Sequence, residues 1–171
     1  MLPKNYRCRL LSNPTISARK MNIALRHGNN SDNNTCSKIM GLALASSETG
    51  DIDRRLLTKP QTTFHFPTSG SLRLLASVDN KEVAFVDYLI SKRHIKYLFV
   101  DPEYQNEGIG TKLLNSAQER MKGGVSVNVL CSNESAILWY LKRGFNVLHC
   151  WAENFDGNQT AWLKLSRREI T

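Results

Sequence analysis

A short run of residues, 105–110, combines features that suit the binding of a phosphate group. It reads Gln-Asn-Glu-Gly-Ile-Gly and follows an apolar segment that ends before Pro102. Apolar side chains at helical spacing come after it, so the two glycines are predicted to open a helix. The first N–H groups of a helix have no partner within it and lie at the positive end of its dipole. Glycine lets an anion approach them, so the run predicts a cradle for a diphosphate.

Two other phosphate motifs do not fit this run. A dinucleotide-binding G-x-G-x-x-G would require glycine where Leu113 stands. A P-loop would require lysine directly after its second glycine, where Thr111 follows Gly110. A helix that merely begins with two glycines is the structural alternative, so a second feature is needed to indicate a site.

That second feature is the run 133–145, which follows a valine-rich segment and reads Asn-Glu-Ser-Ala-Ile-Leu-Trp-Tyr-Leu-Lys-Arg-Gly-Phe. The two runs, in this order, resemble the two signatures of the GNAT superfamily of N-acetyltransferases. The matching residues are Gln105, Gly108 and Gly110 in the acyl-CoA signature, and Asn133, Ala136, Trp139, Tyr140, Gly144 and Phe145 in the second. The resemblance covers residues 70–165 closely and residues 22–57 more loosely.

The resemblance implies that acetyl-CoA is the co-substrate and that no metal is required. It places the diphosphate on the 105–110 loop and the pantetheine arm along the strand that ends at Val100, where that strand parts from residues 125–130. The implied cofactor-binding residues are Leu98, Phe99, Val100, Gln105, Asn106, Glu107, Gly108, Ile109, Gly110, Thr111, Asn133, Ala136 and Tyr140.

The implied reaction is direct attack of a neutral amine on the acetyl carbonyl, with a thiolate leaving. Tyr140 matches the tyrosine that serves the family as general acid; its alternative is a half-buried tyrosine with one structural hydrogen bond. A non-catalytic acyl-CoA-binding module on the same fold is the alternative to an enzyme, since fold does not fix function.

The general base is less defined by the sequence. His94 stands where several family members carry a glutamate, and a histidine can accept a proton near neutral pH. With strict alternation it shares a strand face with Lys96, Leu98 and Val100. A solvated histidine at a strand end is the alternative, and Asp87 and Glu103 are weaker candidates for the base.

Hydrophobic periodicity predicts an α/β layer fold with a mixed sheet of about seven strands and about four helices. The resemblance implies that the layers are of the GNAT type, with a central sheet that is splayed. The predicted strands are 22–26, 72–78, 82–90, 94–100, 125–129, 145–151 and 160–165, and the predicted helices are 35–45, 53–57, 108–122 and 133–143.

Length and charge suggest one domain, residues 21–171, after a basic extension over residues 1–20. The chain has 171 residues and a net charge of +8, of which the acid-free extension carries +5. A targeting peptide is the alternative for the extension, but Pro3 and Pro14 would break an amphipathic helix. The rest of the chain shows no basic cluster of the kind that binds nucleic acid.

The partners and location follow from what the sequence lacks. No run approaches the roughly 18 apolar residues of a membrane span. The four cysteines form no C-x-x-C pair, so we expect a cytoplasmic protein without a metal. The acceptor, a small-molecule or protein amine, stays open, as does the choice between a monomer and a homodimer.

Overall fold

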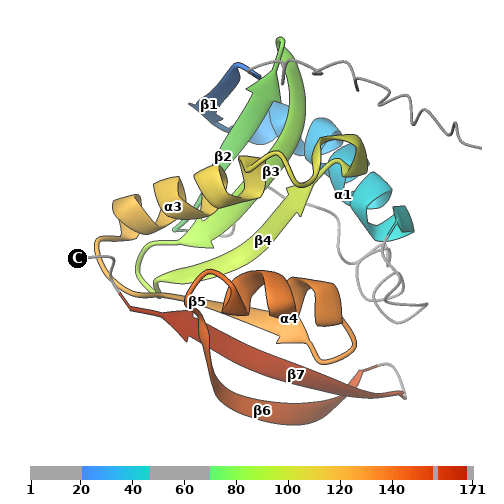
Figure 1. The fold of residues 1–171 in the computed structure, drawn as a ribbon, viewed down its shortest axis with the longest axis vertical. Helices are drawn as coiled ribbons and strands as arrows, with labels where there is room; N and C mark the ends of the chain where they lie inside the picture. Colours follow the sequence, from blue (N-terminus) through green and yellow to red (C-terminus); the bar gives the residue numbers. More distant parts are fainter. Residues whose placement is uncertain (1–20, 47–69, 156–157, 169–171) are drawn as a thin grey trace, which may run out of the picture.

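The computed structural model describes residues 21–46, 70–155 and 158–168, which form a layered α/β structure (Figure 1). The seven-stranded mixed sheet that was predicted is confirmed, with the order β1-β2-β3-β4-β5-β7-β6. Its strands are β1 (Ile23–His27), β2 (Ser71–Val78), β3 (Lys81–Leu89), β4 (His94–Val100), β5 (Val125–Leu130), β6 (Asn146–Phe155) and β7 (Asn158–Arg167).

Three α-helices lie within the described residues, namely α1 (Asn33–Ser46), α3 (Ile109–Met121) and α4 (Glu134–Leu141). Short 3-10 turns, Asn30–Asp32 and Pro102–Tyr104, precede α1 and follow β4. The predicted helix over 53–57 and the extension over 1–20 lie outside the described residues. No helix in the described ranges is both long enough and apolar enough to cross a bilayer.

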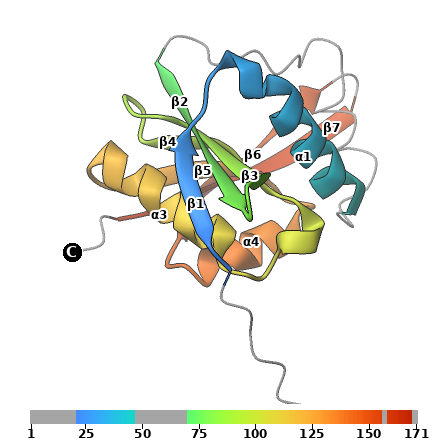
Figure 2. The same cartoon turned by 90° about the horizontal axis from the view of Figure 1, so that it is seen from above.

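The helices cover the sheet from two sides (Figure 2). The larger core packs α3 and Tyr140 of α4 against one face through residues such as Val86, Ile95 and Leu113. The smaller core packs α1 against the other face through Cys36, Leu75 and Phe85, among others. Apolar side chains therefore hold α3 and α4 on one face of the sheet and α1 on the other.

The sheet parts between its two central strands. β4 and β5 are parallel neighbours, but they pair only at His94 with Ser126 and at Ile95 with Val127. Beyond these pairs β4 remains bonded to β3, and β5 remains bonded to β7. The expected parting of these strands is confirmed, and over its second half one edge of β4 pairs with no strand of the described residues.

A β-bulge in β4 corrects one expectation about His94. The antiparallel register with β3 joins Asp87 to Tyr97 but Tyr88 to Ile95, so Lys96 is an extra residue. An extra residue reverses the alternation of faces along a strand. The expectation that His94 shares a face with Lys96, Leu98 and Val100 is therefore wrong, because His94 lies on the side of the sheet that Tyr97 and Phe99 occupy, facing the α1 layer.

A buried ion pair ties β2 to β3 beneath α1. Arg73 and Asp87 are directly opposite in the register, and the guanidinium contacts both carboxylate oxygens, Nε to Oδ1 and Nη2 to Oδ2, each at 2.6 Å. Arg73 also donates to Oδ1 of Asn33 at 2.9 Å, which links the pair to the first turn of α1. Both oxygens of Asp87 are therefore engaged in structure, which disfavours it as a general base.

Removing the charge of Asp87 is expected to destabilise the fold. Asp87→Asn leaves the buried guanidinium without its counter-ion, so the free energy of unfolding should fall by about 3–5 kcal/mol. Urea denaturation measures the change. Glu103→Gln is the matched control, because Glu103 is exposed and lies 4.0 Å from Lys81, so its loss should be near zero. Equal stability of Asp87→Asn and the control would contradict a structural role for the pair.

Candidate active site

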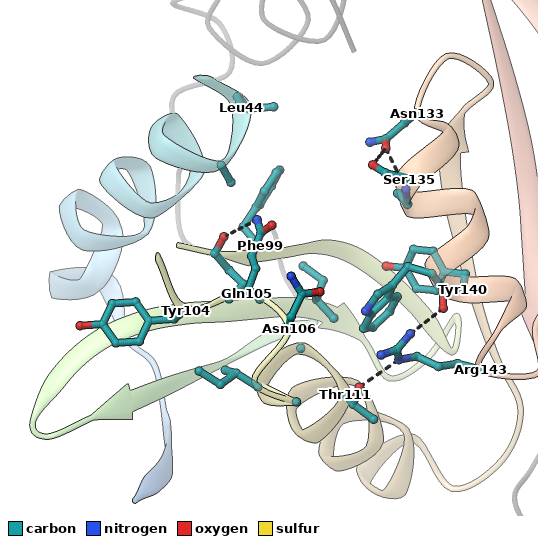
Figure 3. A pocket seen from close by; sticks show the side chains of 18 residues that line it. Leu44, Phe99, Tyr104, Gln105, Asn106, Thr111, Asn133, Ser135, Tyr140 and Arg143 are labelled. Atoms are coloured by element: carbon teal, nitrogen blue, oxygen red, sulfur yellow. Dashed lines mark hydrogen bonds between the residues drawn. The ribbon is translucent and has the colours of Figure 1, made fainter. Parts of the chain in front are cut away.

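A cavity of about 490 Å³ opens where β4 and β5 part (Figure 3). Its walls come from the end of α1, the second half of β4, the loop before α3 with the start of that helix, and α4. This volume lies within the range of small-molecule sites. The residues that line it are Ala43, Leu44, Leu98, Phe99, Val100, Tyr104, Gln105, Asn106, Gly108, Ile109, Gly110, Thr111, Asn133, Ser135, Ala136, Trp139, Tyr140 and Arg143.

The cavity brings together the residues of both sequence runs. Every residue predicted to bind the cofactor lines it except Glu107, which is exposed beside it. Segments some 30 residues apart in the sequence thus share one space, because α3 and α4 both begin beside the gap between β4 and β5. His94 is not among the lining residues.

The two glycines at the start of α3 serve different purposes. Gly108 caps the helix with a φ of +78°, and nothing lies within 4 Å of where its Cβ would be, so the backbone conformation requires glycine. A Cβ on Gly110 would lie 3.2 Å from Cζ2 of Trp139, so this glycine allows α3 and α4 to approach closely. The sequence predicted that both glycines clear space for an anion. The structure adds a separate role for each: Gly108 adopts a left-handed backbone conformation, and Gly110 allows the contact with Trp139.

The start of α3 retains the N–H groups that the sequence predicted. The first bond of the helix is donated by the N–H of Lys112 to the carbonyl of Gly108 at 3.0 Å. The N–H groups of residues 109–111 consequently have no partner within the helix. Ahead of the helix, Nε2 of Gln105 donates to the carbonyl of Val100 at 3.2 Å, which fastens the loop to the end of β4.

Asn133 opens α4 on the other side of the cavity. Its Oδ1 accepts from the N–H of Ala136 at 3.0 Å and from Oγ of Ser135 at 3.2 Å. These bonds cap the helix and fix the side chain. Both bonds use the amide oxygen of Asn133. Its NH₂ group is the part of the side chain that can donate to a ligand.

Tyr140 lies on α4 between two aromatic rings. Trp139 meets it edge-on at 4.9 Å between centroids, and the Phe145 centroid lies 5.0 Å from it. The side chain is 6% exposed, and this burial raises the pKa of the phenol although nearby Arg143 opposes the rise. A phenol that keeps its proton, at the wall of a cavity, can act as a proton donor.

His94 occupies the closed end of the gap instead. It stands at the first of the two β4–β5 pairs, and its Nδ1 lies 3.0 Å from Oγ of Ser126. Burial, followed by the charges of Lys164 and Lys92, lowers its pKa below the ordinary value. The imidazole is therefore neutral at pH 7, which is the form that accepts a proton.

Six cavity residues were not predicted as ligand contacts: Ala43, Leu44, Tyr104, Ser135, Trp139 and Arg143. Trp139 packs against the larger core and on Gly110, and it also lines the cavity. Arg143 stands within the second run, between two residues that match the family signature. The presence of a basic residue at this point of the run could have indicated a ligand contact. That Arg143 lies against α3, however, depends on the tertiary packing.

Comparison with known proteins identifies a related domain family and related folds. Residues 70–147 match the family model described as an acetyltransferase (GNAT) domain. No curated protein matches the chain.

Solved structures with the same fold cover most of the chain. The apo form of YjaB from Escherichia coli is 22% identical with a TM-score of 0.71, over 85% of this chain and 97% of that one. The PaiA N-acetyltransferase of Thermoplasma acidophilum, in complex with coenzyme A, is 19% identical with a TM-score of 0.65, over 87% and 100%. The ribosomal-protein-S18-alanine N-acetyltransferase of Escherichia coli is 16% identical with a TM-score of 0.59, over 85% and 93%.

The left-handed conformation of Gly108 yields a stability prediction. Gly108→Ala should lower the free energy of unfolding by about 1–2 kcal/mol, because alanine is strained at this φ. Gly41→Ala is the matched control: Gly41 lies inside α1 with open space around its Cβ position, so alanine there should stabilise by about 0.5–1 kcal/mol. Thermal or urea unfolding of both variants measures the difference. If the free energy of unfolding changed in the same direction in both variants, the assigned role of the Gly108 backbone conformation would be contradicted.

Proposed function

We propose that this chain, whose residues 70–147 match the acetyltransferase (GNAT) domain model, transfers the acetyl group of acetyl-CoA to a primary amine by direct attack in a ternary complex. One observation carries the proposal. The open start of α3, the unpartnered edge of β4 and the buried Tyr140 surround a single cavity. Binding groups for a nucleotide thioester and a proton donor for its sulfur are thereby next to one another.

The cavity suits acetyl-CoA as a co-substrate. The N–H groups of residues 109–111 can donate to the diphosphate. Past Ile95, β4 has N–H and C=O groups on the side of the gap that no strand in the described ranges satisfies. The amides of a pantetheine arm can pair with them as an added strand would. The free NH₂ of Asn133 supplies a further donor from the α4 side.

Tyr140 is the proposed general acid. Its burial keeps the phenol protonated at neutral pH, and a thiolate that leaves the acetyl group needs a proton or a strong hydrogen bond. Tyr140 would supply that proton from the α4 wall while the neighbouring aromatic rings exclude water from it.

His94 is the proposed general base, acting through water. An ammonium has no lone pair, so the acceptor must lose a proton before it attacks. The neutral imidazole meets the chemical requirement, and its hydrogen bond with Ser126 fixes the ring. Because His94 lies outside the cavity lining, the proton would have to travel along a water chain past the closed end of the gap.

Turnover against a panel of primary amines tests the proposed function. The panel should include small amines, lysine and peptides with free N-termini, with release of the CoA thiol as the readout. We expect amine-dependent release together with an N-acetylated product. Tight CoA binding without turnover on any amine would contradict the proposal and favour a binding module.

Tyr140→Phe is expected to lower kcat by about 10–1000-fold and to leave the Kd for CoA nearly unchanged. The ring and its packing remain, so only the proton donor is lost. Tyr88→Phe is the matched control, because its hydroxyl is buried in the core away from the cavity. Steady-state kinetics and calorimetric CoA binding measure both quantities. An unaltered kcat in Tyr140→Phe would remove Tyr140 from the mechanism.

The role of His94 predicts a particular pH dependence. Its pKa is lowered, so the neutral base persists on acidification until the pH falls below about 6.5. We expect kcat/KM to decline only below that point as His94 becomes protonated, and this decline to be absent from His94→Gln. If kcat/KM declined at the same low pH in His94→Gln, the decline would come from the titration of another group.

A further inference from the structure

We infer that Arg143 binds a phosphate of the acyl-CoA, as a side-chain ligand in addition to the main-chain groups at the start of α3. The inference rests on the proposed function, because it takes acetyl-CoA as the occupant of the cavity. Its basis is the placement of this arginine and the lack of a counter-charge around it among the residues that the structure describes.

Arg143 is fixed between the two helices that border the cavity (Figure 3). Its Nε donates to Oγ1 of Thr111 at 2.9 Å, and its Nη1 donates to the carbonyl of Trp139 at 2.8 Å. The guanidinium also stacks on the Trp139 ring, with Cζ 3.7 Å from the ring centroid. A long side chain that is held by three contacts has already lost much of its freedom before a ligand arrives, which lowers the entropic cost of binding.

No acidic side chain in the described part of the chain forms an ion pair with Arg143. Among residues 21–46, 70–155 and 158–168, the ion pairs involve Arg26, Arg73 and Lys81 but not Arg143. Burial lowers the pKa of its guanidinium, so the surroundings disfavour the cation. Arg167, whose guanidinium Nη1 donates to the carbonyl of Arg143 at 3.2 Å, adds a second positive charge nearby.

Because the Arg143 guanidinium lies against the start of α3, the lack of an acidic partner among the described residues costs more free energy. Thr111 belongs to the first turn of α3, where the helix dipole is positive and favours anions over cations. An anion bound at that turn would offset the repulsion between the guanidinium and the helix dipole. The structure therefore provides two positive features, the helix start and Arg143, that one anion in the cavity would satisfy together.

The unused donors of Arg143 match a phosphate. A guanidinium has five N–H groups in a planar fork, and the bonds to Thr111 and Trp139 occupy two of them. The other three can form the paired, charge-assisted bonds that phosphate oxygens accept. Acetyl-CoA offers such oxygens on its diphosphate and on its 3′-phosphate.

Binding measurements on purified full-length protein test the inference. The ligands are CoA, 3′-dephospho-CoA and pantetheine, and the variants are Arg143→Gln, Arg143→Lys and Lys142→Gln. Lys142→Gln is the matched control: it removes the same charge from the adjacent, exposed residue, which does not line the cavity. Thermal unfolding of each variant checks that the fold is intact.

We expect Arg143→Gln to weaken CoA binding by about 10–100-fold, the loss of a charged hydrogen bond, with a smaller loss in Arg143→Lys. Lys142→Gln should stay within about threefold of the unaltered protein, the scale of an exposed charge. Pantetheine, which lacks the nucleotide phosphates, should bind the unaltered protein and Arg143→Gln equally. A loss that disappears with 3′-dephospho-CoA assigns Arg143 to the 3′-phosphate, whereas a loss that persists assigns it to the diphosphate.

Three results would overturn the inference. One is equal CoA affinity of Arg143→Gln and the unaltered protein. The second is an equal loss for pantetheine, which would mean that Arg143 only holds Trp139 in place. The third is a change confined to the KM of the acceptor amine, which would assign the charge to the acceptor. If the unaltered protein itself fails to bind CoA, the proposed function fails, and this result is distinct from all three.

Discussion

The early end of pairing between β4 and β5 is the constraint on which the site depends. Within β4, His94 and Ile95 are the two residues that pair with β5, although the two strands are neighbours in a continuous sheet. A continuous ladder would fill the space with hydrogen-bonded backbone and leave no room for a ligand. Because β3 retains β4 and β7 retains β5, the sheet can part in its middle without loss of either half.

The contact between α3 and α4 then determines the shape of the opening. Gly110 has no side chain, so the Trp139 ring can lie against the first turn of α3, and Arg143 covers the outer face of that ring. The same packing holds Tyr140 between Trp139 and Phe145. Binding groups and the candidate acid thus share one set of aromatic contacts, so a substitution at Trp139 would disturb both.

Local periodicity predicted the elements well because most of them bury one face. The helix α3 and the strand β5 were both predicted from regular apolar spacing, and both are confirmed. The face of His94 was predicted wrongly for a physical reason. The extra residue Lys96 reverses the alternation, and nothing in the local sequence distinguishes a bulged strand from a regular one.

The sequence by itself determined the order of elements, the glycine-opened helix and the position of Tyr140 at the second signature, because spacing and backbone conformation are local properties. Only the tertiary structure decided that Gly110 accommodates Trp139, that Asp87 is engaged with Arg73, and that Arg143 lies at the start of α3 without a counter-charge from the described residues. These properties depend on which distant side chains come into contact, and contacts of that kind are set by the packing of the whole sheet and its helices.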